Sequence, residues 1–349
     1  NGDSGADVVN IQSSLTPGNQ VVINQNVTII GSSNTYIGGS SYNHKVTYND
    51  ILFYSNATGL SITLKNIKFQ NCGGNTLMKF AGNGNYVLEN CTFENITATG
   101  YKQVIVHLNE GTCNITDCTF EKCSSSYGTV SNYKNDDEPD AVHMYVYGTT
   151  FRNNYAGVEP GAINNCGHLT VCDSTFEDNS AAMWAGAIHT HSNANATIFR
   201  STFINNVAEW NGGALSTYSY LRVVNCTFTS NVARTDKGGG AIFGFSQGSR
   251  PYIIVENCDF DNNTAVTGNG GAIAIINGVL IVDDSRFNDN YAGGNYGGAI
   301  SSVGMGINDF ITNVTNCRFE NNSANKSMGG AIFAINMGHL RVYSSTFIN

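Results

Sequence analysis

Residues 205–245 read NNVAEWNGGALSTYSYLRVVNCTFTSNVARTDKGGGAIFGF and contain the same pattern twice. An asparagine turn leads to Gly-Gly-Ala followed by Leu or Ile, then to a β-rich run, then to Cys-Thr-Phe and a further asparagine turn. Self-similarity at a fixed period indicates a repeat protein, in which each unit must stack on its neighbours to bury its apolar face.

A phenylalanine marks each unit, and consecutive markers are 24 to 32 residues apart. The markers are Phe69, Phe93, Phe120, Phe151, Phe176, Phe203, Phe228, Phe260, Phe287, Phe319 and Phe347. Three residues after the marker, consecutive units carry asparagine, and these positions predict a structural asparagine ladder: Asn154, Asn179, Asn206, Asn231, Asn263, Asn290 and Asn322. Two residues before the marker the residue is small, usually Cys or Ser, so we expect most of the cysteines to be free thiols in a ladder.

The units are predicted to be β rather than helical. Runs such as Leu169–Val171 are short and β-branched, and apolar stripes of helical period are missing. Leu169 and Val171 share one side of a strand, whereas Ser174 and Phe176 have the opposite parity, so the chain must bend between them at Asp173. Three short strands with corners, stacked coil on coil, make a parallel β-helix of about 12–13 coils of roughly 28 residues, about 60 Å long.

Composition limits the function. Only 12% of the residues are charged, against roughly 25% in a typical globular protein. The formal net charge of −9 argues against nucleic acid as a partner, because polyanions bind through clustered Lys and Arg. No apolar run reaches the roughly 18 residues of a membrane helix, and no signal segment opens the chain. The low charge and many Asn-x-Ser/Thr sequences favour an extracellular, cell-surface location.

The pairing of Gly-Gly-Ala-Ile with Phe-x-x-Asn resembles the repeat of chlamydial polymorphic outer-membrane proteins. The Asn- and Thr-rich style, with VVINQNVTIIG near the start, is similar to adhesin-like surface proteins of methanogenic archaea. The resemblance implies a right-handed, pectin-lyase-like solenoid on the cell surface that serves in attachment, and it carries over no catalytic residues. Residues 1–150 match the repeat less well than the rest, because their units lack the glycine-rich element.

The whole chain is expected to be one solenoid domain. Residues 1–68 are predicted to hold an N-terminal cap and the first coils, and residues 69–349 the β-helix repeats. The chain begins at Asn1 and stops in the middle of a unit, so we expect a processed piece whose native form continues with further coils or a cap. Insertions concentrate on one edge of the coils, which in repeat proteins is often the binding face.

Five aromatic residues at the corners are candidates for carbohydrate binding, because ring faces beside polar groups suit sugar rings. They are Tyr155, Trp184, Trp210, Tyr291 and Tyr296, with Glu209 and Asn211 flanking Trp210. The alternative is that these rings only cover the corners against water.

Two groups of residues have metal-ligand chemistry. The acidic loop of Asp136, Asp137, Glu138 and Asp140 offers oxygen ligands for calcium, but it lacks the pattern of an EF-hand and is also explained as a solvated loop. His189, His191 and Cys166 form a trio that zinc could use, although no fourth ligand is evident. We expect no bound cofactor, with calcium as the alternative.

Sequons for N-glycosylation occur throughout the chain, and a chance origin in so Asn-rich a sequence is the alternative explanation. They lie at Asn26, Asn56, Asn90, Asn95, Asn114, Asn195, Asn225, Asn262, Asn313, Asn321 and Asn325.

Attachment to a cell-surface glycan or protein receptor, without catalysis, is the function we expect. A polysaccharide lyase or glycoside hydrolase is the first alternative, since carboxylates such as Glu94, Glu121, Glu177, Asp261 and Glu320 recur after the marker phenylalanine. A structural stalk is the second alternative.

The strand after the glycines places an apolar column outward, which predicts side-by-side association in addition to end-to-end pairing. The column is Cys166, His191, Tyr218, Phe245, Ile276, Val303 and Ile335; opposite parity would put it in the core.

Overall fold

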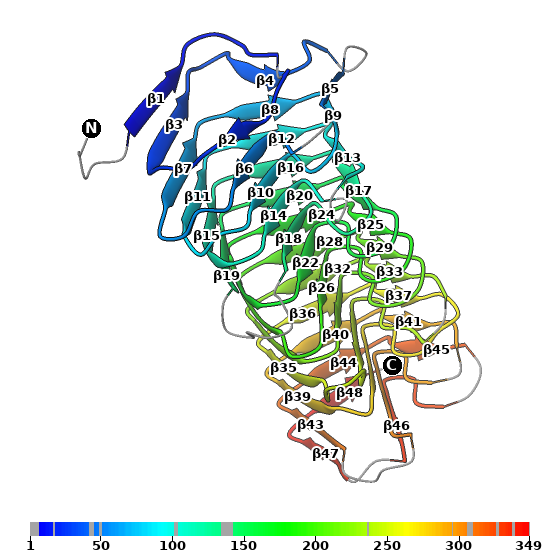
Figure 1. Ribbon diagram of the computed structural model, residues 1–349. Coiled ribbons are helices and arrows are strands. Elements are labelled where there is room, and N and C mark those ends of the chain that lie inside the picture. The colour runs from blue at the N-terminus through cyan, green and yellow to red at the C-terminus, as the bar shows by residue number, and fades with distance from the viewer. Residues whose placement is uncertain are drawn as a thin grey trace.

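The computed structural model describes residues 7–16, 18–41, 45–48, 51–100, 104–133, 142–235, 237–294, 296–305, 310–325, 328–336 and 339–348. Within these residues the strands form four parallel sheets of 13, 12, 12 and 11 strands. Figure 1 shows the sheets stacked along one rod, with the two ends of the chain toward opposite ends of it. The fold is the predicted right-handed parallel β-helix. No helix in the described residues is long and apolar enough to cross a membrane.

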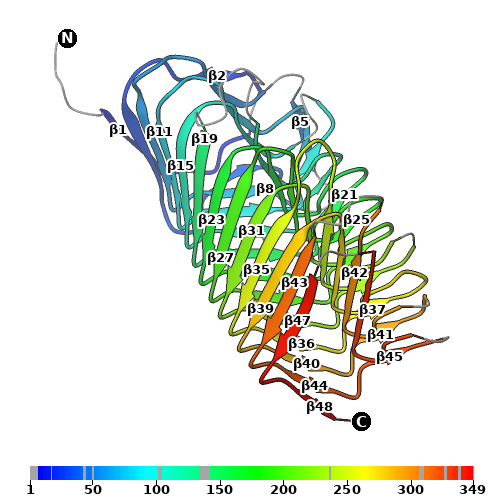
Figure 2. The ribbon, with the colours of Figure 1, turned by 90° about the horizontal axis from the view of Figure 1, so that it is seen from below.

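The long sheet holds the alternating apolar run of each unit. On β23, Leu169 and Val171 are buried inside while Thr170 faces out, and Leu169 lies in register between Met144 and Ala196 of the neighbouring coils. Figure 2 shows these strands side by side along one face. The strands are β1 (Asp7–Ile11), β3 (Val27–Gly31), β7 (Ser61–Lys65), β11 (Asn85–Glu89), β15 (Gly111–Thr116), β19 (Val142–Tyr147), β23 (His168–Cys172), β27 (Asn195–Phe199), β31 (Tyr220–Val224), β35 (Tyr252–Glu256), β39 (Val279–Asp283), β43 (Ile311–Thr315) and β47 (His339–Tyr343).

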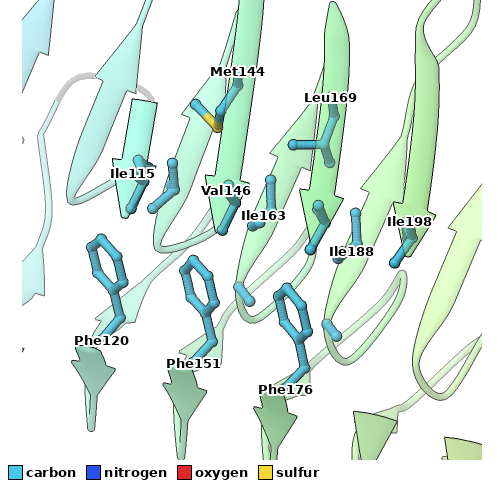
Figure 3. Close-up of a cluster of buried hydrophobic side chains, with 14 of the residues drawn as sticks. Ile115, Phe120, Met144, Val146, Phe151, Ile163, Leu169, Phe176, Ile188 and Ile198 are labelled. Atoms are coloured by element: carbon cyan, nitrogen blue, oxygen red, sulfur yellow. The ribbon is translucent and has the colours of Figure 1, made fainter. Parts of the chain in front are cut away.

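The phenylalanine sheet carries the marker residues, whose rings point inward and stack. From Phe69 to Phe347 the centroids of consecutive rings are 4.4 to 5.1 Å apart. Figure 3 shows three of these rings opposite isoleucines, valine and leucine from the other sheets. The strands are β4 (Tyr36–Gly38), β8 (Lys68–Gln70), β12 (Thr92–Glu94), β16 (Thr119–Glu121), β20 (Thr150–Arg152), β24 (Thr175–Glu177), β28 (Thr202–Ile204), β32 (Thr227–Thr229), β36 (Asp259–Asp261), β40 (Arg286–Asn288), β44 (Arg318–Glu320) and β48 (Thr346–Ile348).

The glycine sheet follows the Gly-Gly-Ala element. Gly212 has a φ of 67°, and a Cβ on Gly213 would lie 2.0 Å from the carbonyl oxygen of Gly240, so the first glycine provides the turn and the second allows the coils to approach. The strands are β2 (Val21–Val22), β6 (Phe53–Ser55), β10 (Met78–Phe80), β14 (Val106–Leu108), β18 (Val130–Asn132), β22 (Ile163–Asn165), β26 (Ile188–Thr190), β30 (Leu215–Thr217), β34 (Ile242–Phe245), β38 (Ile273–Ile276), β42 (Ile300–Val303) and β46 (Ile332–Ile335).

A fourth, short sheet corrects the prediction of three strands per coil. Most of its strands have only two residues, such as Val207 and Ala208, which pair with Val232 and Ala233 of the next coil. Two residues are too few to show an alternating pattern. The strands are β5 (Val46–Tyr48), β9 (Cys72–Gly74), β13 (Thr97–Ala98), β17 (Ser124–Ser125), β21 (Tyr155–Ala156), β25 (Ser180–Ala181), β29 (Val207–Ala208), β33 (Val232–Ala233), β37 (Thr264–Ala265), β41 (Tyr291–Ala292) and β45 (Ser323–Ala324).

Left-handed residues make two of the corners. Asp173, with a φ of 50°, turns the chain from the long sheet to the phenylalanine sheet, as predicted, and Asn205, with a φ of 53°, turns it toward the short sheet. Most residues at these two corners in other coils are also Asn or Asp with positive φ. Asn and Asp tolerate this conformation better than other residues with a Cβ, which explains why they recur at these positions.

The asparagine ladder is present from Asn154 to Asn322. The side chain of Asn206 is typical: its Nδ2 donates to Asn231 Oδ1 at 3.0 Å and to the carbonyl oxygen of Phe176 at 2.9 Å. Its Oδ1 accepts from the backbone nitrogen and the Nδ2 of Asn179. Every polar atom of this buried amide therefore has a partner, and the ladder ties each coil to the next.

The cysteines form part of a second ladder, in which they alternate with serine and threonine. The backbone nitrogen of Ser201 donates to Cys226 Sγ, and that of Cys226 donates to Cys258 Sγ, both at 3.4 Å. All ten cysteines have free thiols. Burial raises the pKa of Cys113, in the core of the long sheet, to about 12, so this thiol is a packing residue rather than a nucleophile.

Candidate functional site

The outer face of the glycine sheet is the candidate functional site. In each strand the first and third residues point into the core, and the second and fourth point outward. The second residues lie in register and are buried although they face away from the core: Asn164, His189, Ser216, Phe243, Ala274 and Ser301. Other parts of the chain must therefore cover this face.

Two sets of segments provide that cover. On one side the corners before the glycines pair with one another, Trp184 with Asn211 and Asn211 with Gly238. On the other side the insertion after β34 folds back over earlier coils, where the Ser249 hydroxyl donates to the carbonyl oxygen of Tyr218 at 2.7 Å and the Ser192 hydroxyl donates to that of Gln247. The insertion edge predicted from unit lengths thus borders the site.

A polar cluster lies at one part of this face and consists of Glu159, Asn164, His189, His191 and Ser216. His191 Nε2 lies 3.1 Å from Glu159 Oε2 and 2.9 Å from Asn164 Oδ1. Asn164 Nδ2 donates to the same Glu159 oxygen at 2.6 Å, and His189 Nδ1 is hydrogen-bonded to the Ser216 hydroxyl. Glu159 reaches the cluster from the corner that precedes β22.

The two histidines have opposite protonation states at neutral pH. Burial opposes the charge of His191, but hydrogen bonds with Cys166 and Glu159 raise its pKa to about 10. Burial, and then the positive charge of His191, lower the pKa of His189 to about 3. Burial acts against the charge of Glu159 as well, yet the hydrogen bond with His191 holds the pKa of this carboxyl below its ordinary value. His191 and Glu159 therefore form an ion pair beside a neutral His189.

Stability is expected to peak near pH 6.5 because of these histidines. The folded state holds the His191 proton up to a pKa of about 10, so stability falls as pH rises from 6.5, the ordinary pKa of histidine, toward 10. The unfolded state takes up the His189 proton more readily, so stability also falls as pH drops from 6.5 toward 3. The melting temperature of His191→Gln should fall less than that of the wild type as pH rises from 6.5 toward 10. His143→Gln, on the outer face of β19, should keep the wild-type profile; an equal change in both variants would contradict the assignment.

Of the two metal sites considered, the zinc trio lies within the described residues and the calcium loop does not. Cys166, His189 and His191 do lie together, but no group of three or more His, Cys, Asp or Glu side chains in the described residues is arranged to hold a metal ion. His191 is engaged by Glu159 and Asn164 instead, so the geometry does not support a zinc site. Asp136, Asp137, Glu138 and Asp140 lie outside the described residues, and the calcium site remains a prediction.

Of the five aromatic candidates, the structure brings only Trp184 and Trp210 together. Their ring centroids are 5.2 Å apart at an interplanar angle of 79°, and Trp184 also meets Tyr218 edge to face at 5.8 Å. Trp184 is half-buried, while Trp210 is 38% exposed.

The other three aromatic candidates lie elsewhere. Tyr296 stacks on Phe333 at 4.2 Å. Tyr155 on β21 and Tyr291 on β41 are separated by four strands of the short sheet.

Three contributors to the site were missed or misplaced by sequence reasoning. Glu159 and Asn164 were not singled out, although Glu-Pro before Gly161 stands where later units have pairs such as Asn211-Gly212, and this is the signal that could have found Glu159. Asn211, expected beside Trp210, is buried, and its Oδ1 accepts hydrogen bonds from the backbone nitrogens of Lys237 and Gly238.

The residues at the fourth position of the glycine-sheet strands point outward and confirm the predicted column. Phe245 and Val303 are half-buried, Ile335 is exposed, and Tyr218 and Ile276 are covered by their neighbours on the outer face rather than by the core. Phe243, Ala274 and Ile276 form a small hydrophobic cluster outside the main core, against which Trp184 packs.

Two of the carboxylates after the marker phenylalanines lie side by side, and each is paired with a basic residue. Glu94 and Glu121 lie in register on neighbouring strands, but Lys68 binds Glu94 at 2.8 Å and Arg152 binds Glu121 at 2.9 Å. The hydrogen bond from Arg152, followed by that from Lys122, lowers the pKa of Glu121. A general acid needs a raised pKa, so Glu121 is not suited to that role.

Most of the predicted glycosylation sites are at the surface. Asn26, Asn56, Asn90, Asn195, Asn225, Asn262, Asn321 and Asn325 are exposed, and Asn114 and Asn313 are partly exposed. Asn95 is the exception: it is 6% exposed, and its Nδ2 donates to Asn71 Oδ1 at 2.7 Å. A glycan on Asn95 would require this hydrogen bond to break, and occupancy of all the sites stays a prediction.

Comparison with known proteins gives two family matches. A family model described as the right handed beta helix region matches residues 103–278, and one for the Chlamydia polymorphic membrane protein repeat matches residues 316–335. No curated protein matches the chain.

Similar solved structures are distant in sequence. They include the A-module of the Azotobacter vinelandii mannuronan C-5 epimerase AlgE6, at 12% identity and a TM-score of 0.39 over 99% of this chain and 91% of that chain. Another is the catalytic domain of a GH87 alpha-1,3-glucanase in complex with nigerose, at 12% identity and a TM-score of 0.42 over 99% of this chain and 70% of that chain. At these scores neither likeness bears on the activity of this chain.

Proposed function

Because the chain belongs to the right-handed β-helix family and carries a polymorphic membrane protein repeat, we propose that it is an extracellular surface protein that attaches to glycans without cleaving them. The observation that carries the proposal is the Trp184–Trp210 pair on the rim of the glycine sheet. A cell-surface glycan is the partner that this pair fits best.

The angle between the two rings is what suits a sugar. Elsewhere on the surface, outward aromatic residues of adjacent coils stack face to face, as Tyr220 and Tyr252 do at 13°, and each ring then covers its neighbour. The edge-to-face contact of Trp184 and Trp210 involves the edge of one ring, so an indole face remains available to the apolar C–H side of a pyranose. Glu209 and Arg234, paired at 3.0 Å beside Trp210, supply polar groups for the hydroxyls.

The electrostatics of the polar cluster favour binding over catalysis. Efficient general acid–base catalysis needs groups whose pKa is close to the working pH. The pKa values of His191 and His189, about 10 and about 3, lie far from 7 in opposite directions. The pKa of Glu159 is lowered rather than raised. These groups are suited to holding the outer face together and to supporting the Trp184 ring, which stacks over His189.

Replacing Trp210 by alanine is expected to abolish attachment to glycans while leaving the melting temperature nearly unchanged, because the ring is partly exposed and outside the core. Binding of the purified protein to a glycan array measures the first effect, and thermal unfolding the second. Tyr145→Ala is the matched control, since Tyr145 is also an exposed outward ring but lies on the long sheet. Attachment retained by Trp210→Ala, or lost equally in both variants, would refute the assignment.

A further inference from the structure

An apolar cavity of about 290 Å³ opens on the outer face of the glycine sheet, and its lining residue Lys237 lies one coil beyond Trp210. Its floor is two columns of outward side chains on β38, β42 and β46: Ala274, Ser301 and Phe333 in register, and Ile276, Val303 and Ile335 in register. Tyr296 comes before β42 in the chain and Met305 after it, and Lys237, Asn269 and Ile275 complete the lining.

The lining is unusual for an outward face. Outward residues of the long sheet are of mixed character, polar at Asn313 and Arg341 and apolar at Ile254, whereas here isoleucine, valine, methionine and two aromatic rings converge. Tyr296 and Phe333 stack at 4.2 Å and make one wall. A concave apolar site with a few polar groups is the usual form of a small-ligand site, and about 300 Å³ is the lower end of the range for such sites.

A lysine side chain lies in the cavity lining. Lys237 is the one charged side chain among the described lining residues, and its Nζ lies 4.1 Å from the centroid of the Phe245 ring. None of the carboxylates in the described part of the chain forms an ion pair with it. An ammonium group beside an apolar cavity complements a ligand with an apolar body and an anionic end.

We propose that this cavity binds the carboxylate of a medium-chain fatty acid, with the acyl chain between Ile276, Val303 and Tyr296 and the carboxylate at Lys237. A neutral sugar would leave the apolar lining without complementary contacts. A cationic amphiphile would meet Lys237 with like charge. The cavity adjoins the tryptophan pair, because the backbone nitrogen of Lys237 donates to Asn211 beside Trp210, but the proposal needs no bound glycan.

Isothermal titration calorimetry with decanoate, decanol and decyltrimethylammonium tests the chemistry, each ligand being used below its micelle concentration. Decanoate should bind, decanol should bind about tenfold more weakly or worse because the charge-assisted hydrogen bond is lost, and the cation should not bind. Shortening the chain to hexanoate should weaken binding further, and tetradecanoate should gain nothing over decanoate. Equal binding of decanoate and decanol, or binding of neither, would overturn the proposal.

Variants locate the site. Lys237→Gln should weaken decanoate binding about tenfold and leave decanol binding unchanged, and Lys237→Arg should restore decanoate binding. Val303→Asp should abolish binding of both, while Lys68→Gln on the phenylalanine sheet should bind decanoate like the wild type. The proposal fails if Val303→Asp still binds decanoate. It also fails if sedimentation shows a dimer that does not bind decanoate and that Val303→Asp dissociates. A second copy of the chain would then cover the cavity.

Discussion

The Gly240→Ala variant is expected to lose more than about 3 kcal/mol of unfolding free energy, or not to fold at all. A Cβ on Gly240 would lie 2.0 Å from the carbonyl oxygen of Gly271 and 2.5 Å from the backbone nitrogen of Thr264. Both atoms belong to the backbone of the next coil, and they cannot move away without opening the hydrogen bonds that join the coils. Chemical denaturation followed by circular dichroism measures the loss.

Gly157→Ala is the control for this prediction. Gly157 also lies in a corner before the glycine sheet, but the nearest atom to an added Cβ is Ser126 Oγ at 3.6 Å, an ordinary contact. Alanine restricts the unfolded chain more than glycine does, so this variant should be unchanged or more stable by about 0.5 kcal/mol. If both variants unfolded at the same denaturant concentration, the close approach of the coils at Gly240 would be wrong.

The Asn231→Ala variant is expected to lose about 3–6 kcal/mol, since several buried polar groups lose their partners at once. Asn231 Nδ2 donates to Asn263 Oδ1 and to the carbonyl oxygen of Phe203, each at 3.0 Å. Its Oδ1 accepts from the backbone nitrogen and the Nδ2 of Asn206, also at 3.0 Å. Water cannot replace these bonds readily, because the residue is fully buried.

Two further variants separate the ladder from simple loss of packing. Asn231→Asp keeps the shape and an acceptor but removes both donated hydrogen bonds, so it should be destabilised about as much as the alanine variant. Asn85→Ala removes a surface amide whose oxygen accepts from Asn114 Nδ2 at 3.4 Å, and it should cost less than about 1 kcal/mol. Comparable losses of unfolding free energy for Asn85→Ala and Asn231→Ala would show that the buried ladder stabilises the fold no more than a surface amide does.

The fold could be predicted because its determinants recur locally in every unit. The parity change around Asp173 places the corner, the asparagine after each phenylalanine makes the ladder, and the Gly-Gly-Ala element gives the close approach. Each of these depends on residues a few positions apart and on the stacking of identical units. The short sheet escaped prediction because strands such as Val207–Ala208 have no periodicity of their own.

The candidate site was less predictable because its contacts join different coils outside the repeat. Glu159 meets His191 from a corner more than one coil away in sequence, and nothing in the repeat pattern specifies which corner side chain reaches over the outer face. The tryptophans were recognised, yet their edge-to-face angle depends on how Trp184 packs against Tyr218. Asn211 was expected to flank Trp210 as a polar group for a sugar, whereas here it pairs with Gly238 in the corner of the next coil.

Incubating the isolated protein with a panel of cell-wall polysaccharides, and then measuring both the amount retained and the chain length of each polysaccharide, tests attachment without cleavage most directly. We predict that at least one polysaccharide is retained by the wild type, that Trp210→Ala releases it, and that its chain length is unchanged after prolonged incubation. Shortened chains, or retention that does not depend on Trp210, would contradict the proposed function.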